Sequence, residues 1–228
     1  MAAVGLRALT GGLLAGHQSR LLSAGVALAI VAFCIHGSWW YYGPGSPTAK
    51  SRRIYGANPF AESPAVGDFL ASHSGPRDRI FVYGSEPQIL FYAQRESASR
   101  YICVYALNLP FDEARDRQLE VLEELAKGPP RLIVATFQQT SHLESPSTPQ
   151  ELRDGLRELL ESAYQLLAVV PYRSDDETKI VTGDAAHRIW TRAPLWDREY
   201  HPWAAFVVWE RNATPSAVFP EARTQRQE

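Results

Sequence analysis

The sequence predicts an α/β protein in which one transmembrane helix precedes a small globular domain. Residues 21–42 contain no Asp, Glu, Lys or Arg, which is typical of a membrane-spanning helix. In the rest of the chain, short β-rich apolar runs alternate with segments of helical periodicity. One of these runs, residues 131–137, is apolar almost throughout, which is typical of a strand covered by helices on both faces of a parallel sheet.

The apolar segment 21–42 has the length and the ending of a membrane anchor. At about 1.5 Å per residue its helix extends about 33 Å, enough to cross the hydrocarbon core of a bilayer. Its last four residues, Trp-Trp-Tyr-Tyr, are the types that settle at a membrane–water interface. A signal peptide has a shorter apolar core and a small-residue cleavage site, and a core helix has a polar face, so an anchor is favoured. Residues 1–20 precede it as a short segment, and residues 43–58 follow as a polar linker.

Charge limits the partners of the globular part but does not orient the anchor. Arg7 and Arg20 precede the apolar segment and Lys50, Arg52 and Arg53 follow it, so the positive-inside rule is almost balanced. All 25 acidic residues lie after residue 61, which makes the globular part acidic. Nucleic acid is therefore not an expected partner, because phosphate binding needs clustered Lys and Arg.

The globular domain is expected over residues 59–212, followed by a polar tail over 213–228. Runs of β-branched and aromatic residues predict strands at 80–83, 101–105, 131–137, 166–170, 187–191 and 204–209, the last two at a sheet edge. Helices are expected to begin at Ser63, which precedes a proline, at Asp112, and at Thr148, where a capping box reads Thr-Pro-Gln-Glu. This alternation predicts a Rossmann-like α/β domain with a parallel sheet.

The stretch Gly84-Ser85-Glu86-Pro87, which we call the corner, directly follows the first predicted strand. A phosphate-binding turn needs several glycines, whereas the corner has one and places Glu86 where the anion would sit. The G-x-S-x-G pattern of a nucleophile elbow is also missing. We therefore expect Ser85 to cap a helix and Pro87 to fix its first turn, and we expect no cofactor.

A narrower interpretation makes this region a ligand-binding surface, because α/β folds bind ligands at the carboxyl ends of parallel strands. The candidate ligand-binding residues have side chains that suit a sugar or a lipid headgroup; they are Ser85, Glu86, Gln88, Tyr92, Arg95, Arg100 and Tyr101. The histidines lack metal-ligand spacing, so no metal site is expected. Catalytic residues are not identified.

Two rival interpretations stay open. In one, the chain is a membrane-anchored hydrolase that uses Asp197, Glu199 or His201 as acid–base groups. In the other, it is a purely structural anchored domain whose tryptophans pack as core or against the membrane surface; they are Trp190, Trp196, Trp203 and Trp209.

Three stretches carry a resemblance to a known family: Asn-Pro-Phe-Ala-Glu-Ser at 58–63, residues 78–92 including Gly-Ser-Glu-Pro-Gln-Ile-Leu-Phe-Tyr, and Ala-Ser-Arg-Tyr at 98–101. With the preceding membrane helix, they resemble the extracytoplasmic C-terminal domain of bacterial multi-spanning glycosyltransferases related to glycosyltransferase family 39, the protein O-mannosyltransferase-like group. The resemblance covers residues from about 21 to about 170.

The resemblance implies lipid-linked sugar donors and a catalytic acidic residue in the first external loop of the membrane domain. This chain departs from that pattern, because no acidic residue precedes Glu62 and only one membrane helix is predicted. The expected role is therefore accessory, in a bacterial inner membrane with the globular part outside the cytoplasm. Implied partners are a polytopic glycosyltransferase subunit or a polyprenyl-linked sugar; a hydrolase or a glycan-binding module is the alternative.

Overall fold

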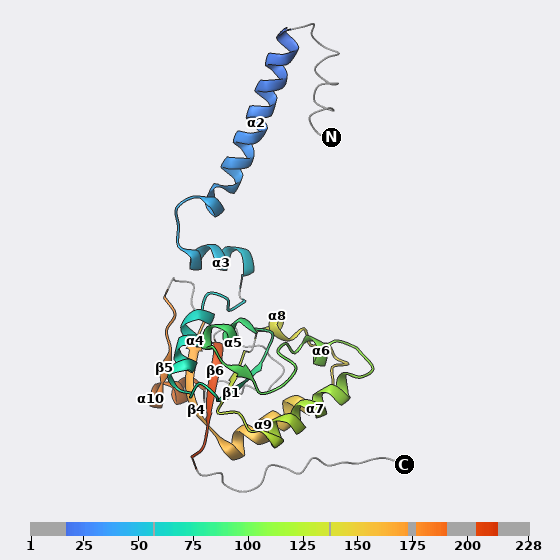
Figure 1. Ribbon diagram of the computed structural model, residues 1–228, viewed down its shortest axis with the longest axis vertical. Helices are drawn as coiled ribbons and strands as arrows, with labels where there is room; N and C mark the ends of the chain where they lie inside the picture. Colours follow the sequence, from blue (N-terminus) through green and yellow to red (C-terminus); the bar gives the residue numbers. More distant parts are fainter. Residues whose placement is uncertain (1–16, 57, 137, 173–176, 191–203, 214–228) are drawn as a thin grey trace. The chain divides into compact units, whose positions relative to one another are not determined.

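A computed structural model of the protein describes residues 17–56, 58–136, 138–172, 177–190 and 204–213 (Figure 1). The chain divides into two compact units, with the boundary between Lys50 and Ser51. Helix α2 (His17–Tyr42) belongs to the first unit, and the boundary falls within helix α3 (Pro47–Tyr55). All six strands belong to the second unit, which we call the globular unit.

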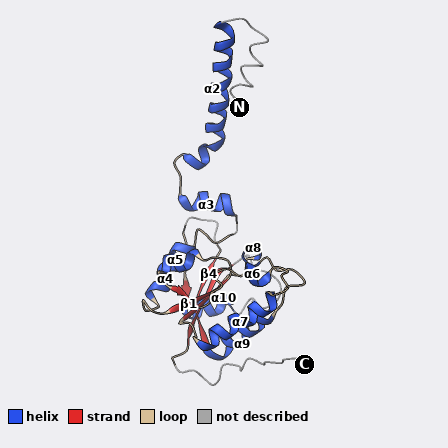
Figure 2. Ribbon diagram, turned by 45° about the vertical axis from the view of Figure 1, so that its right-hand side comes forward, coloured by secondary structure: helices blue, strands red, loops and turns tan. Residues whose placement is uncertain are grey.

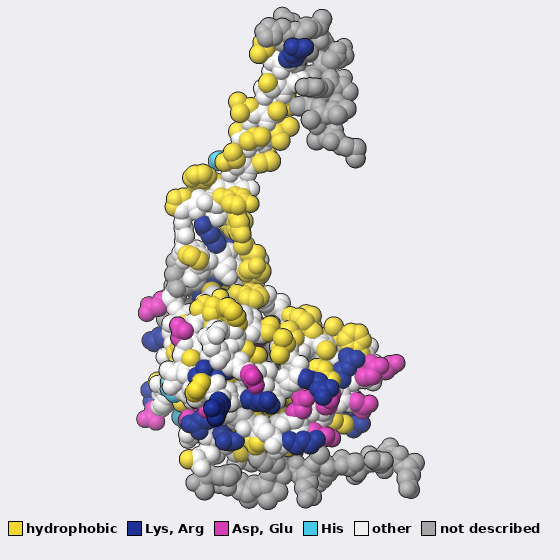
Figure 3. All heavy atoms as spheres, in the orientation of Figure 1, with side chains coloured by type: hydrophobic (Ala, Val, Ile, Leu, Met, Phe, Trp, Pro, Cys, Tyr) yellow, Lys and Arg dark blue, Asp and Glu magenta, His cyan; other side chains and the backbone are white. Residues whose placement is uncertain are grey.

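Helix α2 contains a segment, Arg20–Tyr42, that is long and apolar enough to span a membrane. Its mean hydropathy is 2.0 and none of its apolar window is buried, so α2 is not a core helix of the described structure. Figure 3 shows hydrophobic side chains along α2. The predicted apolar helix is confirmed. The predicted linker 43–58 instead contains α3, which begins with Ser-Pro, the same start signal as at Ser63. The Ala49 N–H donates to Ser46 Oγ over 3.3 Å at this start.

The globular unit contains one mixed sheet, whose strand order is β2-β1-β3-β6-β4-β5. The strands are β1 (Arg79–Tyr83), β2 (Glu96–Ser97), β3 (Leu132–Ala135), β4 (Tyr164–Pro171), β5 (Val181–Thr182) and β6 (Ala204–Arg211). Strand β1 is parallel to β2 and β3, whereas β6 is antiparallel to both β3 and β4. The α/β class is confirmed, but the sheet is only partly parallel and the Rossmann-like arrangement is not confirmed.

Helices cover both faces of this sheet. They are α4 (Ser63–Ser72), α5 (Gln88–Ala93), α6 (Tyr105–Asn108), α7 (Ala114–Lys127), α8 (Gln139–His142), α9 (Glu151–Ala163) and α10 (Gly183–Trp190). Figure 2 shows α4 and α5 on one face of the strands and α7 and α9 on the other. Side chains alternate along the central strands, so Ile80 and Val82 pack with α4 and α5 while Phe81 and Tyr83 pack with α7 and α9.

Two predicted strands are wrong, and a third lies at another place in the sheet than predicted. Residues 101–104 form a loop and Tyr105 begins α6, because the Val104 N–H bonds to the Gly84 carbonyl after β1 instead of joining a ladder. Residues 187–190 belong to helix α10, whose Ala186 packs into the core, and Thr191 lies outside the described residues. Residues 204–209 form a strand as predicted, but β6 lies inside the sheet between β3 and β4.

The predicted capping box at Thr148 is also wrong. Helix α9 begins at Glu151, and no side chain caps it at Gln150. Thr148 Oγ1 instead donates to the Asn108 carbonyl over 2.8 Å. The start of α9 is held by the buried Gln118 of α7, whose Oε1 accepts from the Leu152 N–H over 2.9 Å. A tertiary contact therefore replaces the local cap.

Candidate functional site: the acidic corner at the end of β1

The corner lies where the carboxyl ends of β1 and β3 meet. Because these strands are parallel and Tyr83 pairs with Ala135, the next residues, Gly84 and Thr136, lie side by side. The Thr136 N–H donates to the Tyr83 carbonyl over 3.1 Å. A Cβ at Gly84 would overlap both the Thr136 methyl group and the Glu86 carboxylate. Glycine therefore allows the Glu86 side chain to fold back over the strand ends.

Glu86 is the most perturbed acid of the described structure. Its side chain is only 4% exposed, and its Oε1 accepts a hydrogen bond from the Ser141 hydroxyl. Burial raises its pKa from 4.5 to about 7, against the opposing effects of the Ser141 hydrogen bond and the Ser85 backbone. Its Oε2 is buried and has no hydrogen-bond partner among the described residues. This carboxyl group therefore keeps its proton to a much higher pH than an ordinary glutamate does.

Helix α8 closes the corner on the side opposite β1. His142 is 2% exposed, and its Nε2 lies 2.7 Å from the Thr136 carbonyl oxygen. Burial lowers the pKa of His142, which favours the neutral ring that donates Nε2–H to this carbonyl. The rings of His142 and Tyr83 lie 4.7 Å apart. Gln138 then joins α8 to the first residue of β6 by donating to the Ala204 carbonyl over 3.3 Å.

Ser85 does not cap α5. This helix begins at Gln88, its N-cap position is Pro87, and no side chain caps it. Ser85 Oγ is buried without a hydrogen-bond partner in the part of the chain that the structure describes. The expectation of a simple helix cap is therefore wrong, and the corner contains two buried oxygen atoms, Ser85 Oγ and Glu86 Oε2, that lack a partner there.

The segment 58–63 packs directly on the corner. Gln88 Nε2 donates to Ser63 Oγ over 3.1 Å, and Ser63 Oγ donates to the Pro59 carbonyl over 2.8 Å. Glu62 is 1% exposed, and its Oε1 lies 2.8 Å from Nη1 of Arg52 in α3. The two groups form an ion pair whose geometry does not meet that of a hydrogen bond. Two of the stretches that carry the family resemblance are thus joined in space.

The other predicted ligand-binding residues lie elsewhere. Arg95 uses its guanidinium to bind the carbonyl oxygens of Ala71 and Ser74, which fastens α5 to the end of α4. Tyr92 packs its Cβ against the backbone at Gly67, and the residue is 41% exposed. Arg95 and Tyr92 thus contact α4 rather than the corner.

Arg100 and Tyr101 form a third group, which contacts α7. Arg100 pairs with Glu120 over 3.0 Å and with Glu124 over 3.2 Å, and the Tyr101 hydroxyl donates to Glu120. Burial and the Glu120 carboxylate raise the pKa of Tyr101. The seven predicted residues therefore do not form one site; Ser85 and Glu86 lie in the corner, and Gln88 directly follows it.

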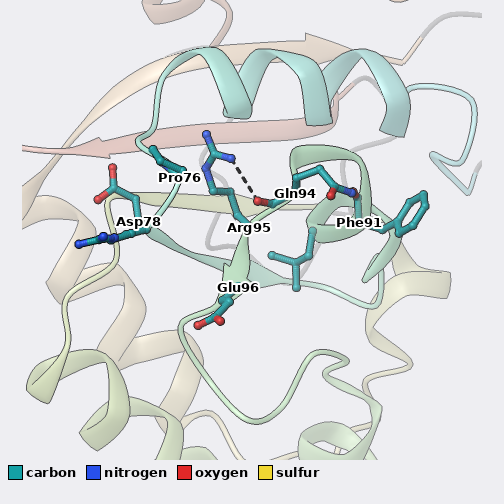
Figure 4. A pocket seen from close by; sticks show the side chains of 8 residues that line it. Pro76, Asp78, Phe91, Gln94, Arg95 and Glu96 are labelled. Carbon is teal, nitrogen blue, oxygen red and sulfur yellow. Dashed lines mark hydrogen bonds between the residues drawn. The ribbon is translucent and has the colours of Figure 1, made fainter.

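A shallow cavity of about 570 Å³ lies at the other end of β1, away from the corner. The residues that line it are Pro76, Arg77, Asp78, Leu90, Phe91, Gln94, Arg95 and Glu96. Asp78 directly precedes β1, which places the cavity at the amino end of that strand. Figure 4 shows the Phe91 ring pointing away from Asp78 and Glu96, so the cavity has no aromatic face turned toward its acids. Its polar groups do not converge on one point.

The described residues give no support for a metal site, and the rival catalytic residues lie outside them. Among the residues that the structure describes, no group of three His, Cys, Asp or Glu side chains could hold a metal ion. Asp197, Glu199 and His201 lie outside the described residues, as do Trp196 and Trp203. Trp209 is 4% exposed and its ring lies 5.0 Å from that of Trp190, so these two tryptophans pack in or against the core as predicted.

The corner and helix α8 together bury the Glu86 carboxyl group, whose pKa is about 7, and the neutral imidazole of His142. Such a carboxyl group can hold or release one proton, and it can donate a hydrogen bond when protonated. Sequence reasoning singled out Glu86 but missed Ser141, His142 and Thr136, which reach the corner only through the pairing of β1 with β3. No family model, curated protein or solved structure matches this chain. The family resemblance stays a prediction.

Proposed function

We propose that this chain is a membrane-anchored accessory domain for lipid-linked glycosyl transfer, with its globular unit outside the cytoplasm of a bacterium. The observation that carries the proposal is the sealed corner. Glu86 is 4% exposed and the hydroxyl of Ser85 is buried, so the most distinctive motif of the chain holds the strand ends together instead of presenting reactive groups. General acid–base catalysis needs a group within hydrogen-bond reach of the substrate.

The contact between the two motif stretches supports the same role. Gln88, the first residue of α5, donates to Ser63, and Glu62 pairs with Arg52 of α3, the helix that follows the anchor. These bonds fix the segment that enters the globular unit against the carboxyl ends of β1 and β3. In the proposed assembly, this fixed surface lies beside a polytopic glycosyltransferase subunit and shapes access for a polyprenyl-linked sugar or its acceptor.

The experiment is a transfer assay with the full chain and a membrane glycosyltransferase subunit purified with it. We expect the full chain alone to transfer no sugar from a polyprenyl-linked donor, and its addition to raise transfer by the polytopic subunit. The Glu86→Gln variant, which keeps the corner closed, should raise it equally. Transfer by the chain alone, or the lack of any polytopic protein in the purified complex, would refute the proposal.

A second candidate, an anchored hydrolase, is favoured by one observation. The pKa of Glu86 is raised to about 7, which is the range of a general acid at neutral pH. For this function the corner would have to open to admit a substrate. Hydrolysis of a glycan or ester substrate by the full chain, abolished in Glu86→Gln, would establish it; equal activity of the two proteins would exclude Glu86 as its catalyst.

A further inference from the structure

Most of the exposed large apolar side chains of the described globular unit lie at one end of it, apart from Phe91 and Tyr92 of α5. Six of them, between 37% and 50% exposed, are Ile54, Tyr55, Phe60, Ile102, Phe111 and Leu143, which we call the apolar edge. Figure 3 shows hydrophobic side chains at the end of the globular unit where α5, α6 and α8 lie in Figure 1. Exposed apolar residues scattered singly are normal, whereas a gathered set marks a contact surface.

The topology explains why these residues share one end. Helix α4 leads into the start of β1, so Phe60, which precedes α4, lies near the opposite, carboxyl end of that strand. Ile102 follows β2, which is parallel to β1. Phe111 precedes α7, which runs back to the start of β3, and Leu143 follows β3 through α8. All these loops therefore lie at the carboxyl ends of the parallel strands.

Hydrogen bonds join these loops into one surface. The Tyr105 hydroxyl donates to the Thr140 carbonyl over 2.8 Å, and Asn108 Nδ2 donates to the His142 carbonyl over 3.0 Å. The Thr140 hydroxyl in turn bonds to Asn58 Oδ1. At the far side, the rings of Tyr55 and Phe60 lie 4.6 Å apart. The surface is thus continuous from the end of α3 to the loop before α7.

Leu143 has an unusual backbone for an apolar side chain facing water. Its φ is 51°, in the left-handed region that a branched side chain adopts only at an energetic cost, and it is 45% exposed. This conformation ends helix α8, where the Leu143 N–H donates to the Gln139 carbonyl. It places the Leu143 side chain at the apolar edge, where the described part of the globular unit does not bury it.

The short connection between the apolar segment and the globular unit favours the membrane surface as the cover of the apolar edge. Ser51, the first residue of the globular unit, follows Tyr42, the last residue of the apolar segment, by nine residues. Nine residues span at most about 30 Å when extended and less where they are helical, as in α3. The chain then passes directly into Tyr55 and Phe60, so the apolar edge begins at the end of the globular unit that the anchor tethers.

We infer that the apolar edge rests in the headgroup region of the bilayer that holds the anchor. Aromatic and aliphatic side chains at this depth are stabilised by partial removal from water. The ammonium group of Lys50 in α3, which donates to the Gly43 carbonyl over 2.7 Å, has the charge that suits anionic headgroups. This inference concerns the lipid contact of the globular unit and goes beyond the proposed accessory function.

The test uses the full chain alone in vesicles of phosphatidylcholine and phosphatidylglycerol. In a background with Cys34→Ala and Cys103→Ser, a single environment-sensitive fluorophore is attached at Phe111→Cys or Leu143→Cys. The matched control is Lys127→Cys, at the opposite end of α7 and 77% exposed. We expect labels at the first two positions to be quenched at least threefold more strongly by headgroup-level nitroxide lipids than the control label. Aqueous iodide should quench them less.

Equal quenching of all three labels by iodide would overturn the inference. A surface covered by a protein partner instead would also leave the Phe111 and Leu143 labels in water in these vesicles, and that result counts against lipid contact. A further label at Phe60→Cys tests the apolar edge at another loop. Circular dichroism of every variant tests whether the substitution has unfolded part of the protein. The transfer assay is independent of this outcome, since an accessory role does not require that lipid covers the apolar edge.

Discussion

Replacing Glu86 with glutamine is expected to change how the stability of the globular unit depends on pH. The folded state holds this carboxyl at a pKa of about 7 because burial disfavours its charged form, whereas the unfolded chain has the ordinary value of 4.5. Between these two values the folded state keeps a proton that the unfolded state has released. The free energy of unfolding therefore falls as pH rises through this range and levels off above about pH 7.

The magnitude follows from the two pKa values. A difference of about 2.5 units, at 1.36 kcal/mol per unit, corresponds to about 3 kcal/mol of unfolding free energy lost between pH 4.5 and pH 8. Glutamine has the same shape, can still accept from Ser141, and does not titrate. The Glu86→Gln variant should therefore lack this loss and should become more stable than the parent as pH rises.

The assay is urea unfolding of the full chain in lipid nanodiscs, followed by tryptophan fluorescence at pH values from 4.5 to 8. His142 is buried with a lowered pKa, so it contributes a slope of opposite sign below pH 6.5, where the unfolded chain takes up a proton. His142 is present in both proteins, so the difference between them isolates Glu86. Parallel pH profiles of parent and variant would refute the reasoning, because they would mean that Glu86 is ionised in the folded protein.

Three further substitutions test the corner and its surroundings by urea unfolding in detergent. Gly84→Ala should lower the unfolding free energy by about 2 kcal/mol or more, because the added methyl meets Thr136; an unchanged midpoint would show that the strand ends can separate. Leu143→Gly should raise it by about 0.5–1 kcal/mol by relieving the left-handed backbone, and a loss would contradict the assigned strain. Glu62→Gln should cost about 3 kcal/mol because it leaves Arg52 buried without its carboxylate; a cost below about 1 kcal/mol would mean that the pair is solvated.

The sequence predicts those parts of the fold whose signal is local. Leucines spaced along 152–160 face the core from α9 as expected, and the predicted runs at 80–83 and 131–137 contain residues of the adjacent parallel strands β1 and β3. The position of β6 was predicted wrongly although its signal was present. Residues 204–209 are all buried and apolar, which is the same pattern that placed the run 131–137 inside the sheet. Consistent use of that rule would have moved β6 away from the edge.

The rest of the site depends on contacts that no local pattern specifies. Glu86 lies in a polar corner by composition, whereas in the structure it is buried and accepts a hydrogen bond from Ser141, which is 55 residues away in sequence. The start of α9 is held by Gln118 from another helix, so the capping signature at Thr148 was outweighed by a tertiary hydrogen bond. The β-rich composition of 101–105 misled for the same reason, because Tyr101 bonds to Glu120 of α7 rather than to a neighbouring strand.

The position of β6 has a consequence for folding during synthesis. This strand is the last in the described chain, yet it lies between β3 and β4 and pairs with both. While the polypeptide is still being synthesised, β3 and β4 therefore present open edges to which other chains can add, until residue 211 has left the ribosome. A nascent chain that stops short of that point has two half-sheets and no means of joining them, so chaperones and proteases would recognise truncated products readily.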